Sequence, residues 1–229
     1  MIAEINSKIS KSGSNISDRQ EDKLTGDIFG ALRYLPYDLG LEKILSKRSV
    51  VFGKRIDDFE FCINQTELDV YDEYIEFWPR DKEAELDVLI HTKYLEIGIE
   101  VKYLSGLSSD DEDGITFENS NNQIIREMRS LLRRCDSSKK AVLIFIAMEP
   151  ECREIATRIA KDKKLSAEIE FSYLSWETIL ESINSITTND PFYKVILKDM
   201  CDLLSKKNFN RFTDFSVEEI VNDVLYFSF

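Results

Sequence analysis

Histidine and closely spaced cysteines are almost absent from the 229-residue chain. His91 is the single histidine, and the four cysteines lie far apart with no C-x-x-C spacing. This scarcity argues against a zinc cluster, which needs several such ligands close together in sequence. It argues equally against a Ser-His-Asp or Cys-His catalytic group, since only His91 could serve in one. We therefore expect reduced thiols in a cytoplasmic protein.

Long apolar runs are also missing. The longest, Ala141–Met148, has the length of a strand, whereas a membrane-spanning helix needs about 20 predominantly apolar residues. Residues 1–16 are polar and lack the apolar segment of a signal peptide. We expect them to form a flexible arm, residues 17–229 to form a single domain, and the protein to have no membrane partner.

Positive charge is in deficit. The chain has 30 Lys and Arg residues and 43 Asp and Glu residues, which gives a net charge of -13. Nonspecific affinity for a nucleic-acid duplex comes mostly from neutralised phosphates, so this overall charge disfavours nucleic acid as a partner. It does not exclude one, because a local basic face can coexist with an acidic remainder.

The charges within one apolar stretch are the strongest functional signal. Two apolar runs, Val88–Ile90 and Tyr94–Tyr103, are separated by a polar break, which predicts a pair of antiparallel strands. Because side chains alternate along a strand, Glu100 and Lys102 share one face of the second strand. The apolar residues that alternate with them, Ile99, Val101 and Tyr103, point the other way.

A pair of carboxylates is expected where the two strands meet. If the connection centres on residues 93 and 94, Asp87 lies roughly opposite Glu100. Two like charges about 4 Å apart repel by roughly 4 kcal/mol in a partly buried setting, so such a pair takes up a proton or holds a cation. Oxygen-only ligands favour Mg²⁺ or Mn²⁺, which suggests a metal-assisted hydrolytic site. The alternative is a solvated strand face with a surface ion pair that contributes about 0 to 1 kcal/mol.

These residues resemble a known signature. Asp87, followed by Glu100-Val101-Lys102 at the end of the next strand, is similar to the pattern of the PD-(D/E)XK nuclease superfamily, the restriction-endonuclease-like phosphodiesterases. The resemblance implies that Asp87 and Glu100 bind Mg²⁺ or Mn²⁺, that the main-chain carbonyl of Val101 adds a ligand, and that Lys102 positions or activates the attacking water. Many members have proline before the aspartate, where this chain has Leu86.

One helix is expected to bring a further carboxylate to this site. Ser17–Gln20 has the pattern of a capping box and predicts a helix to about Tyr34, ended by Pro36. Glu21 lies on the apolar stripe of that helix, where a carboxylate can simply be stabilised by the helix dipole. In the resembling family a glutamate on the helix before the strands supports the metal, a role that would fall to Glu21.

A second helix is predicted at Asn121–Arg134. Gln123 opens it, and a RecB-like subset of the family carries a glutamine there that lines the active site and is followed four residues later by tyrosine. Glu127 takes the later position here, so only the glutamine half of the pattern remains. Another stripe of this helix is basic and either faces water or contacts the substrate phosphates. Its members are Arg126, Arg129 and Arg133.

The predicted fold class is α/β. The resemblance implies a restriction-endonuclease-like αβββαβ core, a mixed sheet flanked by helices, over about residues 18–148. Residues 149–229 are expected to form a C-terminal extension, largely helical, that packs on this core or makes a homodimer contact. Further strands are predicted at Phe59–Ile63, Val70–Trp78, Ala141–Met148 and Ile169–Leu174. Further helices are predicted at Cys152–Lys164, from Ser175, at Asp190–Lys206 and from Ser216. Residues 41–55 are expected to form a solvated loop or helix.

The sequence leaves two functions open. The first is a divalent-metal-dependent nuclease, for which we expect DNA as the substrate over RNA. The second is a protein that keeps the nuclease-like fold without activity and binds nucleic acid or a protein partner, which the net charge of -13 favours.

Overall fold

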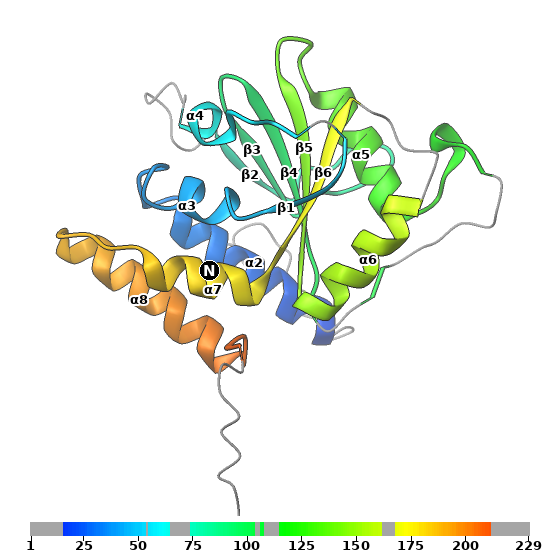
Figure 1. Ribbon diagram of the computed structural model, residues 1–229. Helices are drawn as coiled ribbons and strands as arrows, with labels where there is room; N and C mark the ends of the chain where they lie inside the picture. The colour runs from blue at the N-terminus through cyan, green and yellow to red at the C-terminus, as the bar shows by residue number, and fades with distance from the viewer. Residues whose placement is uncertain are drawn as a thin grey trace, which may run out of the picture.

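The central strands of the structure are the apolar runs of the sequence. The computed structural model describes residues 20–53, 55–64, 74–103, 106–107, 115–161 and 168–211, and the backbone of residues 16–19. Its strands are β1 (Ser49–Phe52), β2 (Ile75–Phe77), β3 (Val88–His91), β4 (Leu95–Val101), β5 (Lys140–Ala147) and β6 (Ile169–Ser175). They form one mixed sheet in the order β1-β6-β5-β4-β3-β2 (Figure 1). β4, β5 and β6 are parallel, whereas β1, β2 and β3 run antiparallel to their neighbours.

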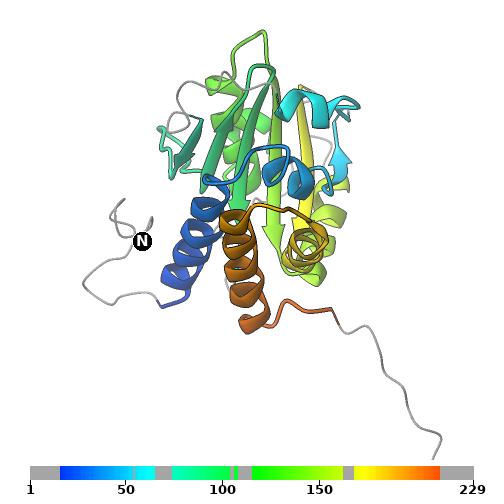
Figure 2. The ribbon, with the colours of Figure 1, turned by 90° about the vertical axis from the view of Figure 1, so that its left-hand side faces the viewer.

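Helices cover both faces of this sheet. One face carries α2 (Ile16–Leu32), α3 (Leu41–Leu45), α7 (Trp176–Ser185) and α8 (Pro191–Lys206), and the other carries α5 (Gln123–Arg134) and α6 (Glu149–Lys161) (Figures 1 and 2). The short elements are α4 (Phe59–Ile63) and the 3-10 helix η2 (Phe117–Asn119). Since both faces are covered, every residue of β4 is buried. None of the helices in the described ranges is long and apolar enough to cross a membrane.

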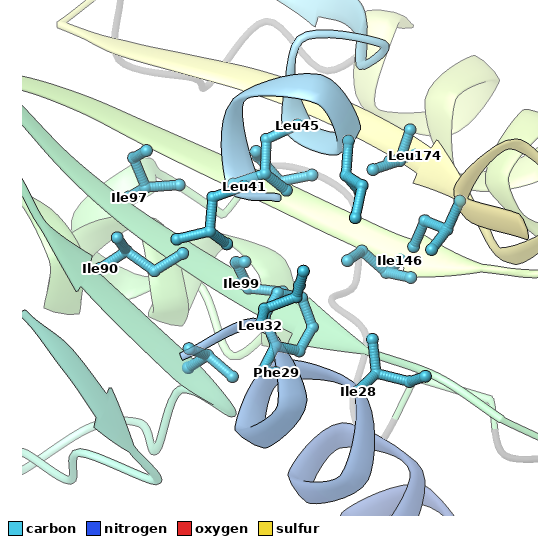
Figure 3. Packing of buried hydrophobic residues seen from close by; sticks show 14 of the residues in the cluster. Ile28, Phe29, Leu32, Leu41, Leu45, Ile90, Ile97, Ile99, Ile146 and Leu174 are labelled. Atoms are coloured by element: carbon cyan, nitrogen blue, oxygen red, sulfur yellow. The ribbon is translucent and has the colours of Figure 1, made fainter. Parts of the chain in front are cut away.

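Two apolar layers hold the helices to the sheet. In the first layer, Ile28 and Leu32 of α2 and Leu41 of α3 pack with Ile99 of β4 and Ile146 of β5 (Figure 3). In the second layer, apolar residues of α5 and α6 pack on the opposite face of the same strands. These layers fix α2 and α5 on opposite faces of β4.

The hairpin predicted from the sequence is confirmed. β3 pairs with β4 in a register that joins Val88 to Ile99 and His91 to Glu96. One step further, the same register places Asp87 opposite Glu100. The α/β class is also confirmed, as a mixed sheet flanked by helices. The predicted helices that correspond to α2, α5, α6, α7 and α8 are present, with ends that differ by a few residues.

The strand predicted at Phe59–Ile63 is wrong, because this segment is the helix α4. Its aromatic and branched residues favoured a strand, but its buried side chains are Phe59, Cys62 and Ile63, while Glu60 and Phe61 are exposed. That is a spacing of three and four residues, which suits one side of a helix and not the alternation of a strand. A five-residue segment is too short for its pattern to separate the two.

Two other expectations need adjustment. Residues 41–55 contain the helix α3, but the expected loop or helix is wrong for Ser49–Phe52, which forms β1 and pairs with β6. The strand predicted at Val70–Trp78 corresponds to the shorter β2. Residues 70–73, the N-terminal arm up to residue 15 and the helix predicted from Ser216 lie outside the described residues.

Gly98 of β4 allows close packing of α5, which carries Gln123. A Cβ atom at Gly98 would lie 3.1 Å from Leu131 Cδ2 and 3.3 Å from both Leu86 Cδ1 and Leu143 Cδ1.

We predict that Gly98→Val lowers the free energy of unfolding by about 1 to 3 kcal/mol through overpacking. Urea unfolding measures this change. Gly106→Val is the control, because no atom of the described residues outside its two chain neighbours lies within 4 Å of a Cβ atom there. Equal stability of Gly98→Val and the wild type would show that this packing is not tight.

Candidate active site

The predicted site residues meet at the carboxyl end of β4. Because β3 is antiparallel to β4, Asp87 at the start of β3 lies beside Glu100 and Lys102 at the end of β4. Glu21 reaches the same place from α2, and Gln123 from the first turn of α5. The five side chains predicted to form the site are therefore brought together, from four separate segments of the chain.

Lys102 is held between two carboxylates. Its Nζ donates hydrogen bonds to Glu100 Oε1 at 2.6 Å and to Glu21 Oε1 at 3.2 Å. All three side chains are largely buried, with exposed fractions of 8% for Lys102, 3% for Glu100 and 12% for Glu21. Burial lowers the pKa of Lys102, but the charges of Glu100, Glu21 and Asp87 together raise it above its ordinary value. Lys102 therefore stays a charged ammonium.

Glu100 is oriented from two sides. In addition to Lys102, its Oε1 accepts a hydrogen bond from Gln123 Nε2 at 2.5 Å. Burial and the nearby charge of Glu127 raise the pKa of Glu100 well above its ordinary value, against the opposing effect of Lys102. Lys102 and Gln123 thus both contact the same oxygen of Glu100, Oε1.

Asp87 closes the end of the β3–β4 ladder. Its main-chain amide donates to Ile99 O at 3.1 Å, and its Oδ2 accepts from the Val101 amide at 2.8 Å. Burial, followed by the charge of Glu100, raises the pKa of Asp87 well above its ordinary value. Asp87 and Glu100 are thus close neighbours, and the Val101 carbonyl stays a predicted ligand.

Glu127 is a member of the site that sequence reasoning did not include. Its side chain is 1% exposed and lies within reach of Gln123 and Glu100, and no residue in the described ranges forms a hydrogen bond with its Oε2. Burial is the main cause that raises its pKa to about 8. The sequence signal that could have identified Glu127 is its place on the apolar side of α5, beside Ile124 and Met128.

Two residues of the C-terminal part of the chain also adjoin the site. The indole Nε1 of Trp176, at the start of α7, donates to the Lys102 carbonyl at 3.1 Å. Glu151 of α6 lies close enough for the charges of Lys102 and Glu21 to act on it, and burial raises the pKa of its carboxyl. No sequence pattern connected either residue to β4.

The arginine stripe of α5 lies against the segment that leads into β3. Arg126 donates to the Glu83 carbonyl at 2.7 Å, Arg129 to Glu83 Oε2 at 2.7 Å, and Arg133 to Glu83 Oε1 at 2.9 Å and Asp81 Oδ2 at 2.5 Å. These bonds tie α5 to the chain that carries Asp87. Contact of the three arginines with phosphates stays a prediction.

The site has more negative than positive groups. We call Glu21, Asp87, Glu100 and Glu127 the carboxylate cluster; Lys102 is the ammonium that lies among them. Within the described ranges, no three His, Cys, Asp or Glu side chains are grouped so that they could hold a metal ion by themselves. Two carboxylates and a main-chain carbonyl nevertheless fit a hard cation that completes its shell with water or phosphate oxygens. The raised pKa values of Asp87 and Glu100 fit the same view, since these groups lack sufficient counter-charge.

Comparisons with known proteins add no relative. Neither protein-family models, nor curated proteins, nor solved structures match this chain.

The raised pKa of Glu127 predicts how stability depends on pH. The ordinary value is 4.5 and the folded value about 8, so the folded protein binds more protons than the unfolded chain between these pH values. The stability linked to this proton is complete below pH 4.5 and is lost as the pH rises through 8. With metal chelated, the wild type should lose up to about 1.4 kcal/mol per pH unit relative to Glu127→Gln. Urea unfolding of both proteins across this interval measures the difference, and parallel pH curves would refute the assignment.

Proposed function

We propose that this protein is a divalent-metal-dependent nuclease of the PD-(D/E)XK type that hydrolyses phosphodiester bonds in DNA. The observation that supports it is the meeting of Asp87, Glu100 and Lys102 at the ends of two paired strands, in a buried cluster with excess negative charge. A site of this kind binds a divalent cation because the cation offsets the unfavourable repulsion between the carboxylates.

The arrangement of elements supports the same proposal. α2, the β2-β3-β4 meander, α5 and β5 follow one another in the αβββαβ order of a restriction-endonuclease-like core, with α3, β1 and α4 between α2 and β2. The charged residues lie at the point of that order where the resemblance requires them. β6 continues the sheet beyond this core, and α7 and α8 pack on the face that carries α2.

Each side chain has a role that its contacts explain. A bound Mg²⁺ or Mn²⁺ would lower the pKa of a water molecule and neutralise charge on the scissile phosphate. Asp87, Glu100 and the Val101 carbonyl would hold that ion. Lys102 remains protonated, so its ammonium can orient the attacking water and stabilise the negative charge that develops on the phosphate.

Glu21 and Gln123 have supporting roles. Glu21 accepts from both Lys102 Nζ and the Tyr103 amide, the latter at 2.8 Å, and so holds the ammonium and the chain after it together. Gln123 donates to the Glu100 oxygen that Lys102 also contacts, and so orients the carboxylate toward the ion. Glu21 therefore positions Lys102, and Gln123 positions Glu100.

An inactive protein with the same fold is the second candidate. Lys102 is already paired with Glu100 and Glu21, as in a structural ion network, and the chain carries a net charge of -13. Such a protein would bind nucleic acid or a protein partner without cleavage. The nuclease proposal is preferred because one ammonium cannot balance four carboxylates.

We predict that Lys102→Ala abolishes DNA cleavage. With Mg²⁺ or Mn²⁺, the wild type should degrade linear, circular or single-stranded DNA, and the variant should be slower by about 100-fold or more because it has lost charge stabilisation in the transition state. Gel electrophoresis of the products measures this, with circular dichroism to verify the fold. Lys139→Ala is the matched control, because Lys139 pairs with Glu96 at the opposite end of β4.

The outcomes separate the two candidates. Cleavage by the wild type and the Lys139 variant, with none by the Lys102 variant, supports the nuclease. Equal cleavage by all three proteins would identify a contaminant and remove the proposal. DNA binding without cleavage by the wild type would favour the inactive protein.

A further inference from the structure

The main chain around Lys102 is held from three directions. Its amide donates to the Ile146 carbonyl of β5 at 2.7 Å, and the next amide, of Tyr103, donates to Glu21 at 2.8 Å. The Lys102 carbonyl accepts from the Trp176 indole at 3.1 Å. β4 ends at Val101, so Lys102 and Tyr103 lie beyond the strand and are held by these bonds.

Trp176 is itself firmly fixed. Its side chain has no exposed surface, and its ring stacks on Phe209, with ring centres 5.5 Å apart and planes inclined by 22°. Phe209 also contacts Tyr103 edge to face at 5.6 Å. The aromatic group of Trp176, Phe209 and Tyr103 therefore joins α7 and the chain after α8 to the residue that follows Lys102.

We infer that Trp176 is a positioning residue for Lys102, and that its indole N–H fixes the direction in which the lysine side chain leaves the end of β4. This inference rests on the proposed nuclease function. The hydrogen bonds of its amide and carbonyl hold the backbone of Lys102 and with it the direction of the Cα–Cβ bond. From that starting direction the ammonium reaches Glu100 and Glu21. A small change in the position of a catalytic group lowers the rate by about 10- to 100-fold. By holding Lys102 in position, the N–H of Trp176 therefore acts on catalysis without contact with the substrate.

The test compares Trp176→Phe with Ile183→Val in DNA cleavage with Mg²⁺. Trp176→Phe keeps an aromatic ring against Phe209 and removes the donor, whereas Ile183→Val, in the same helix α7, weakens buried packing and keeps the donor. We expect Trp176→Phe to lower kcat by about 10-fold or more with KM unchanged, and Ile183→Val to lower thermal stability while kcat per folded molecule stays at the wild-type value. Equal kcat in Trp176→Phe and the wild type would overturn the inference, as would equal losses of kcat in both variants.

A second measurement covers the case in which Trp176→Phe does not fold. Incorporation of 3-benzothienylalanine in place of tryptophan keeps the shape of the ring and replaces the N–H by sulfur. The chain has two tryptophans, so the same replacement in a Trp78→Phe background changes Trp176 alone, and the unlabelled Trp78→Phe protein is its reference. A reduced kcat with unchanged KM supports the inference, and an unchanged kcat refutes it. If the wild type cleaves no DNA at all, the proposed function fails first, which is a distinct result.

Discussion

Unbalanced negative charge at the end of β4 is the constraint on which this structure depends. Lys102 neutralises part of the carboxylate cluster, but its ammonium is shared between Glu100 and Glu21. Among the described residues, Asp87 and Glu127 are buried without a cationic partner within ion-pair distance, and burial is the first cause of the rise in the pKa of Asp87, Glu100 and Glu127. Buried charges are costly when they are not paired, so the cluster must take up protons or bind a cation. A site that only stabilised the fold would not need this excess.

The fold offsets the free-energy cost of burying these charges by surrounding the carboxylate cluster with rigid elements. The end of β4 is a continuation of a fully buried strand, and the neighbouring helices are held to the sheet by two apolar layers. Glu21 enters from one face and Gln123 from the other. The first turn of α7 adds Trp176. Four elements therefore determine the geometry of two residues, Glu100 and Lys102, which lets acidic groups stay close together despite their repulsion.

The part of the site that could be predicted from sequence depended on local periodicity. The alternation of β4 and the short connection to β3 were sufficient to place Asp87 opposite Glu100, because register in a hairpin follows from turn position. Helical spacing placed Glu21 on the apolar stripe of its helix, whereas Gln123, and the site role of both residues, came from the family resemblance. Glu127 was missed because a carboxylate on a helix looks solvated until the strands that cover it are known. Trp176 was missed because it is separated from Lys102 by 74 positions. β1 was missed for a similar reason, since its partner β6 lies more than 100 residues away.

Calorimetric titration of Mn²⁺ into the purified protein tests the central claim most directly, because it measures cation binding independently of any substrate. The account predicts a saturable heat of binding in the wild type that is lost in Asp87→Asn and retained in Glu96→Gln, a buried carboxylate at the other end of β4. No measurable heat in the wild type, or equal heat in the wild type and Asp87→Asn, would contradict the claim that this cluster exists to hold a cation.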